Sequence, residues 1–257
     1  MKFAPLRNNL TLLSTALSAA VMISTAAIGG EGHSHGIRSP VDDAKVADFD
    51  IVAAEVKLNG RFATFTMSTA GTAGASGPEA TGGGAPGASI WAYVWPTTLD
   101  PSAVGFGEGT GILALAATNH PDFDDTPLFD ENIDGDTGND GGHWHSHWVV
   151  LTPNEECGPG ALAVRDVAEG TNPVMPATWP GVPFYLDSPG FTPVFDGPTI
   201  TINVVLANSD ISALKGVNFD GATTALRVDT DFHAPYVCVV DVFDIASGDL
   251  SLPGRVD

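Results

Sequence analysis

Residues 50–68 read DIVAAEVKLNGRFATFTMS and carry the clearest structural signal in the chain. Two runs rich in β-branched and aromatic residues flank the dipeptide Asn59-Gly60. That dipeptide favours a two-residue hairpin turn because both of its positions accept a positive φ. The segment therefore predicts an antiparallel β-hairpin with one strand on each side of the turn.

Seven further runs of similar character follow, separated by clusters of glycine, proline, asparagine and aspartate. In TITINVVLA, for example, apolar residues alternate with polar ones, as a half-buried strand requires. The predicted strands cover residues 89–95, 112–118, 143–152, 161–167, 199–207, 222–228 and 235–245. This pattern predicts an all-β protein, and we expect a single-domain antiparallel β-sandwich with long loops.

Two segments interrupt this pattern. Residues 69–88 are rich in glycine and alanine and lack the large apolar side chains that would offset the entropy cost of ordering, so we expect a flexible loop. Residues 171–198 contain seven prolines, which favours a long ordered surface excursion over strands. The hairpin before the first segment is too small to stand alone, so we expect one domain.

The first thirty residues resemble a secretory signal. Lys2 and Arg7 precede an apolar stretch from Leu10 to Ile28, and small residues follow. We therefore expect a signal peptide over 1–30 and an exported domain over 31–257, in the periplasm, at the cell surface or secreted. Because serine and threonine interrupt the apolar stretch, we do not expect stable membrane insertion.

The net charge of the chain indicates which kinds of partner it can bind. The formal net charge of −21 repels nucleic acid and favours cations or neutral surfaces, while no feature identifies a protein partner.

The two cysteines, Cys157 and Cys238, predict a disulfide in an oxidising compartment. A thiolate metal site is the alternative, but the cysteines lack the close spacing typical of such sites.

The segment GGHWHSHWVVL places three histidines at alternate positions of a predicted strand. His143, His145 and His147 therefore share one face, and the intervening Trp144 and Trp148 take the other. Imidazoles are good ligands for copper and zinc. Because the first and third histidines lie about 13 Å apart on a strand, only neighbouring pairs reach one ion. His145 and His147 rank first because they lie deeper in the apolar run, and His143 comes next.

A complete metal site needs a further donor from another strand. His120 follows the predicted strand at 112–118, and His233 precedes the one at 235–245. Either histidine could supply the third ligand, or could cap its strand by hydrogen bonding. We expect a ring nitrogen of one of them to lie within metal-bridging reach of His145 or His147.

The motif HWHSHW, the aromatic SIWAYVW and the exported β-rich chain together resemble the surface-associated copper-binding proteins of methane-oxidising bacteria, the MopE and CorA group. Their copper site uses two histidines and a tryptophan oxidised to kynurenine. The resemblance implies copper acquisition or storage, with Trp144 or Trp148 beside the ion. The shorter HSHW is similar to the zinc-binding strand of α-type carbonic anhydrases, which makes a zinc-dependent periplasmic metalloenzyme the alternative.

An acidic loop precedes the histidines. Asp130, Asn132 and Asp134 match the first half of an EF-hand calcium loop, and Asp136 could complete the shell, although the match ends before the glutamate at position twelve. Solvated turn residues are the alternative. A structural surface protein with a calcium-stabilised loop is thus a third hypothesis. Since no nucleophile elbow, phosphate loop or dinucleotide motif is visible, we expect a binding protein rather than an enzyme.

Overall fold

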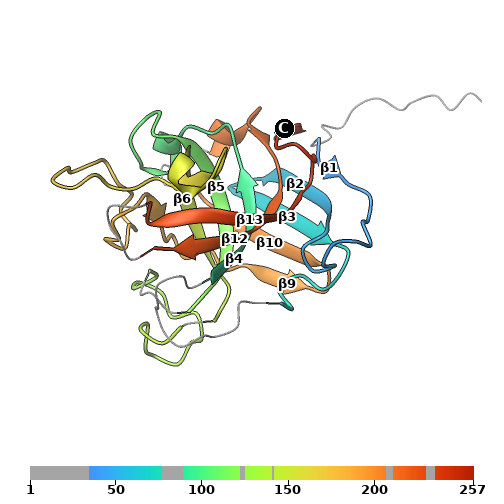
Figure 1. Ribbon diagram of the computed structural model, residues 1–257, viewed down its shortest axis with the longest axis horizontal. Coiled ribbons are helices and arrows are strands. Elements are labelled where there is room, and N and C mark those ends of the chain that lie inside the picture. The colour runs from blue at the N-terminus through green and yellow to red at the C-terminus, as the bar shows by residue number, and fades with distance from the viewer. Residues whose placement is uncertain (1–34, 77–88, 122–124, 141, 207–210, 230–234) are drawn as a thin grey trace, which may run out of the picture. The chain divides into compact units, whose positions relative to one another are not determined.

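The computed structural model describes residues 35–76, 89–121, 125–140, 142–206, 211–229 and 235–257. The expected signal peptide, most of the glycine- and alanine-rich segment and His233 lie outside these ranges. The described residues belong to one compact unit and form strands that pair antiparallel throughout (Figure 1). No helix among them is long and apolar enough to cross a lipid bilayer.

The predicted hairpin is present, with its turn displaced by one residue. Strand β2 (Ile51–Asn59) pairs with β3 (Phe62–Thr69), and Asn59 is opposite the first residue of β3. The two-residue loop is therefore Gly60-Arg61 rather than Asn59-Gly60. Gly60 has φ 61°, which is the positive value that a primed turn requires at its first central position.

This hairpin is the centre of a five-stranded sheet. The strand order is β1-β2-β3-β10-β9. The three flanking strands are β1 (Ile37–Arg38), β9 (Val194–Asp196) and β10 (Thr199–Val204). On β10 the buried residues Ile200, Ile202 and Val204 alternate with less buried neighbours, as the sequence predicts for a half-buried strand.

The second sheet closes on itself, which corrects the expected plain sandwich. Its order is β5-β4-β12-β13-β7-β6-β8, and β5 also pairs with β6, so six strands form a closed barrel. β8 pairs with Trp148 and Val149 of β6, next to the residues of β6 that pair with β7. Its strands are β4 (Ser89–Pro96), β5 (Ile112–Asn119), β6 (His145–Pro153), β7 (Leu162–Val164), β8 (Leu186–Asp187), β12 (Ala222–Val228) and β13 (Val237–Ile245). Closure removes two exposed sheet edges, which explains why it is favourable.

Short elements complete the fold. We expected no strands in the proline-rich stretch 171–198, but β8 and β9 both lie in it. The remaining elements are β11 (Asn218–Phe219), β14 (Gly254–Arg255) and the 3₁₀ turns η1 (Pro101–Val104), η2 (Glu155–Cys157) and η3 (Ile211–Leu214).

Two hydrophobic cores result from this arrangement. One lies between the five-stranded sheet and the outer face of the barrel, where Phe65 meets Trp148 edge to face. The other lies inside the barrel and contains Ala116 and Val149. Because side chains alternate along a strand, β6 contributes Trp148 to the first core and Val149 to the second. One strand thus forms the wall between them.

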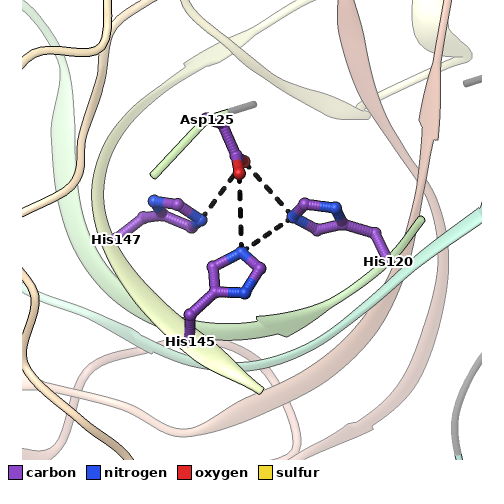
Figure 2. A group of neighbouring side chains, drawn as sticks. All are labelled: His120, Asp125, His145 and His147. Carbon is purple, nitrogen blue, oxygen red and sulfur yellow. Dashed lines mark hydrogen bonds and ion pairs between the residues drawn. The ribbon is translucent and has the colours of Figure 1, made fainter. Parts of the chain in front are cut away.

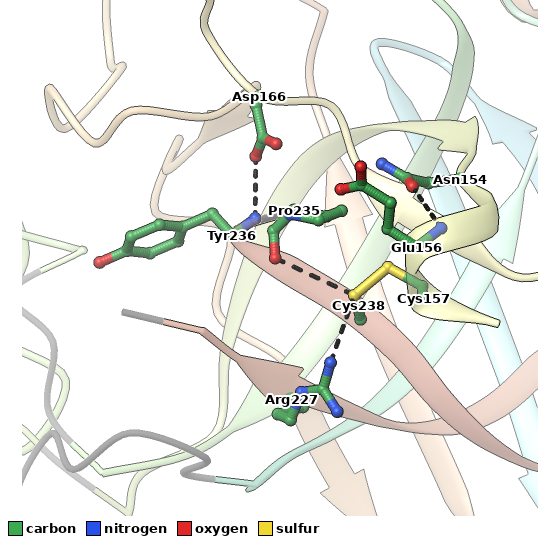
Figure 3. The surroundings of a disulfide bond; sticks show 8 residues. All are labelled: Asn154, Glu156, Cys157, Asp166, Arg227, Pro235, Tyr236 and Cys238. Carbon is green, nitrogen blue, oxygen red and sulfur yellow. Dashed lines mark hydrogen bonds between the residues drawn. A yellow bond between two sulfur atoms is a disulfide. The ribbon is translucent and has the colours of Figure 1, made fainter. Parts of the chain in front are cut away.

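The predicted disulfide is confirmed. Cys157 in η2 is bonded to Cys238 in β13, 81 residues further along the chain (Figure 3). Cys238 is completely buried and lies opposite Ala163 of β7. The bond therefore attaches the turn before β7 to the strand on which β7 docks.

Candidate metal centre

Three histidines converge at one end of the barrel interior. His145 and His147 lie on the face of β6 that also carries Val149, inside the barrel. His120 directly follows β5 and continues its inward row, since it lies two residues beyond Thr118. The β5–β6 register places Thr118 opposite His145. His120, two residues after Thr118, is therefore at the same end of the barrel as His145 and His147.

The ring nitrogens meet around one carboxylate (Figure 2). His145 Nε2 lies 2.9 Å from His120 Nε2. Asp125 places its carboxylate oxygens 3.2 Å from His120 Nε2 and 3.7 Å from His145 Nε2. His147 Nε2 lies 3.4 Å from the same carboxylate. All four residues are buried, and one donor atom from each lies within 4.8 Å of the others, so together they could hold a metal ion.

Backbone carbonyls fix the tautomers of two of these rings. His120 Nδ1 lies 2.7 Å from the carbonyl oxygen of Pro121, and His145 Nδ1 lies 3.0 Å from that of His143. A carbonyl oxygen can only accept, so each Nδ1 must carry the hydrogen. In the neutral ring the lone pair is then on Nε2. Nε2 of His145 is therefore the nitrogen that accepts or binds, and it lies 2.9 Å from Nε2 of His120.

A serine fixes the third ring. His147 Nδ1 lies 3.1 Å from Ser188 Oγ. The Ser188 hydroxyl donates its one hydrogen to the backbone carbonyl of Asp125, so its oxygen accepts from His147. Nε2 of His147 is consequently also the unprotonated nitrogen, and it is buried without a hydrogen-bond partner. Ser188 thus connects two members of the cluster.

Burial keeps the imidazoles of His145 and His147 neutral. It lowers the pKa of His145 to about 3, and the positive charges that His147 and His120 can carry act in the same direction. Burial also lowers the pKa of His147 to about 4, although the Asp125 carboxylate opposes it. Burial alone would raise the pKa of Asp125, but the positive charge that His120 and His147 can carry and a hydrogen bond with His120 outweigh it and hold that pKa well below its usual range. Neutral imidazoles and an ionised carboxylate are the forms that bind metal.

His143 does not join the cluster. It lies before β6 begins at His145, two residues later than predicted, and its side chain is exposed. Its contribution is the backbone carbonyl that orients the ring of His145. His233, the other predicted donor, lies outside the described residues. Of the two proposed partners from outside the HWHSHW strand, His120 is the one the structure places at the site.

The tryptophans lie on the opposite side of β6 from the histidines. Trp148 is buried with its ring 6.0 Å from that of Phe65, and Trp144 packs 5.3 Å from the ring of Tyr93. Strand alternation is the reason, because residues at even and odd positions point to opposite faces. Neither Trp144 nor Trp148 therefore contacts the histidine cluster.

The sequence interpretation missed Asp125 and Ser188. The available signal for Asp125 was the acidic run HPDFDDTP, which starts at His120 and places carboxylates close to a candidate ligand. Ser188 gave no signal, since it lies in the proline-rich stretch 41 residues from His147.

The predicted calcium ligands cap the turns of their own loop. Asp130 accepts hydrogen bonds from the backbone N–H groups of Asp134 and Gly135, and Asn132 accepts from Asp134 as well. Asp134 in turn accepts from the N–H of Asp136. Such side-chain to backbone bonds are typical of asparagine and aspartate in turns. Calcium binding by Asp130, Asn132, Asp134 and Asp136 stays a prediction.

Comparison of the whole chain with protein-family models, with curated proteins and with solved structures finds no significant match. The resemblance to bacterial copper-binding proteins therefore stays a prediction.

Proposed function

We propose that this protein binds one divalent transition metal ion through Nε2 of its three clustered histidines and the carboxylate of Asp125. The observation that carries the proposal is the convergence of four buried residues whose donor atoms, three imidazole nitrogens and one carboxylate oxygen, lie within 4.8 Å of one another. Burial lowers the pKa of His145 to about 3 and that of His147 to about 4, which keeps both rings in the neutral form that binds a metal ion.

The surroundings of the rings support the same proposal. Each Nδ1 donates to an oxygen, namely the carbonyls of Pro121 and His143 and the hydroxyl of Ser188. Metal-binding histidines usually have such a partner, which fixes the tautomer and the ring orientation. Buried polar atoms without partners are costly, so the unsatisfied Nε2 of His147 also favours a ligand at this position.

Copper(II) is the ion we propose first. The cluster offers imidazole and carboxylate donors and no sulfur, which favours a divalent ion over copper(I). Among divalent first-row ions copper(II) generally binds nitrogen and oxygen ligands most tightly. We therefore propose copper binding, for acquisition or storage in an exported protein.

A zinc-dependent enzyme is the second candidate. Three nitrogen donors and one oxygen donor suit tetrahedral zinc. The specific observation in its favour is that His120, Asp125 and His147 line a cavity of about 480 Å³, which a small molecule could occupy.

Metal analysis tests both candidates. Protein purified without chelators or an affinity tag is exposed to equimolar copper(II) and zinc, dialysed, and analysed by mass spectrometry for metal per chain. We expect about one copper per chain in the wild type. His143→Ala is the matched control, because it removes an exposed imidazole and keeps the carbonyl that orients His145.

The double variant His145→Ala/His147→Ala should lose the metal while His143→Ala retains it. Zinc in place of copper would favour the second candidate. The proposal is wrong if the double variant retains as much metal as the wild type, or if the wild type retains none. Circular dichroism of each variant checks that its β-structure is intact.

A further inference from the structure

The barrel interior contains a cavity where small barrels are normally filled by side chains. Three inward positions on three strands are alanines: Ala92 on β4, Ala116 on β5 and Ala222 on β12. These short side chains leave a cavity of about 480 Å³. That volume is within the range of about 300–1,000 Å³ found for small-molecule sites.

The cavity is apolar along its length and polar at one end. Aliphatic side chains form most of its wall, among them Ile90, Val149 and Leu226. His120, Asp125 and His147 also line it, so the metal-binding end of the barrel opens into a mostly apolar space, whose other polar lining residues include Thr118, Thr224 and Asp241. From His147 to Leu151 the wall formed by β6 is about 13 Å long.

Strand β13 forms one side of a mouth. Only its first two residues, Val237 and Cys238, pair with β7. Further along β13, Val240 and Val242 line the cavity and are each 47% exposed, and residues 159–162, which lead into β7, line it as well. Large apolar side chains exposed around an opening are typical of ligand sites. The disulfide attaches the turn that precedes residues 159–162 to β13 and holds the two sides of the mouth together (Figure 3).

We propose that the cavity binds a medium-chain carboxylic acid, with its hydrocarbon chain along the barrel and its carboxylate at the metal. This inference rests on the proposed metal site. A divalent ion and the Asp125 carboxylate together leave one positive charge, which is costly in apolar surroundings. A second carboxylate neutralises that charge. The net charge of −21 opposes anions only weakly, because salt screens exposed charges beyond about 8 Å.

Calorimetry with straight-chain ligands on the copper(II)-loaded wild type tests this inference. Affinity should rise from butyrate through hexanoate to octanoate by about fourfold per methylene, which corresponds to ~0.8 kcal/mol. Octanol should bind at least about tenfold more weakly than octanoate because it lacks the charged head group. Octanoate should also change the copper electron paramagnetic resonance spectrum.

Ala92→Leu fills the cavity without altering a ligand of the metal. It should weaken octanoate binding at least about tenfold and leave the copper content unchanged. Ala44→Leu adds the same atoms at an exposed position and should change neither quantity. If Ala92→Leu does not fold, the chain-length series on the wild type decides alone.

The outcomes separate this inference from the proposed function. A wild-type protein that retains copper but does not bind octanoate, or binds butyrate and octanoate equally, contradicts the inference alone. Equal affinity for octanol contradicts the role of the metal in holding the head group. A wild type that retains no metal contradicts the proposed function and the inference with it.

Discussion

Metal binding at pH 5.5 should release far fewer protons here than at a histidine site on a protein surface. The relevant pKa values are those of His145 and His147, which burial lowers to about 3 and about 4. Because these values lie below the ordinary value, both rings have already lost their protons well above pH 4. The incoming ion then has no protons to displace from them.

The size of the effect follows directly. An exposed histidine with a pKa of about 6.5 is roughly nine-tenths protonated at pH 5.5, so two such residues release about 1.8 protons per ion. With pKa values of about 3 and 4, His145 and His147 together release less than about 0.1. Between pH 7.5 and 5.5 two exposed histidines would lose about 100-fold in affinity, whereas this pair should lose almost none.

Calorimetric titration with zinc at pH 5.5, in two buffers of different ionisation enthalpy, measures the number of protons released per ion. His120 can add at most one proton, so we expect a total of no more than about one. A release of two or more would refute the reasoning that the fold presents neutral imidazoles. His143→Ala, which removes an exposed ring outside the cluster, should give the same count as the wild type.

Other predictions concern groups around the site. Ser188→Ala should weaken metal binding about 10–100-fold, because it removes the hydroxyl that accepts a hydrogen bond from the ring of His147. Competition with a chromophoric chelator would measure the affinity, and an unchanged affinity would exclude an orienting role for Ser188. Cys157→Ser/Cys238→Ser, which opens a loop with a sequence separation of 81, should lower the free energy of unfolding in urea by about 4–5 kcal/mol, and a loss under about 1 kcal/mol would contradict this. Trp148→Ala should cost about 3–5 kcal/mol in the same assay while the folded fraction keeps its metal; loss of metal from folded protein would place the indole at the site. Burial raises the pKa of Asp187 from 3.8 to about 6, so the stability that this group contributes is fully present below pH 3.8 and is lost as pH rises from there to 6; Asp187→Asn should therefore melt above the wild type at pH 8 and by a much smaller margin at pH 4, and equal margins at both would count against this.

The sequence located the strands well because both signals, the alternation of apolar and polar residues and the enrichment in β-branched residues, are visible within a few neighbouring residues. Each of the seven runs after the hairpin contains a strand, and β12 matches its predicted bounds. The closure of the barrel could not be predicted in this way. It depends on β5 pairing with β6 across the acidic segment and on β7 bridging β6 and β13, which are contacts between distant parts of the chain.

The sequence likewise predicted part of the candidate site but not all of it. Strand alternation was sufficient to put His145 and His147 on one face and the tryptophans on the other, and the structure follows that rule. The expectation of a tryptophan beside the ion came from the family resemblance instead. Asp125 and Ser188 lie outside the strands, where alternation makes no prediction, so their positions at the cluster required the fold.

The packing of strand β6 indicates that substitutions distant from the metal site can change which ion the site prefers. The spacing of His145 and His147 is set by the pleat of this strand, and the opposite face of the pleat packs through Trp148 on Phe65. A change of volume at Phe65 would shift the strand and alter the separation of two ligands without contacting either. Variants of the core between the five-stranded sheet and the barrel are therefore a route by which the preference between ions of different coordination geometry could evolve while all four donors stay unchanged.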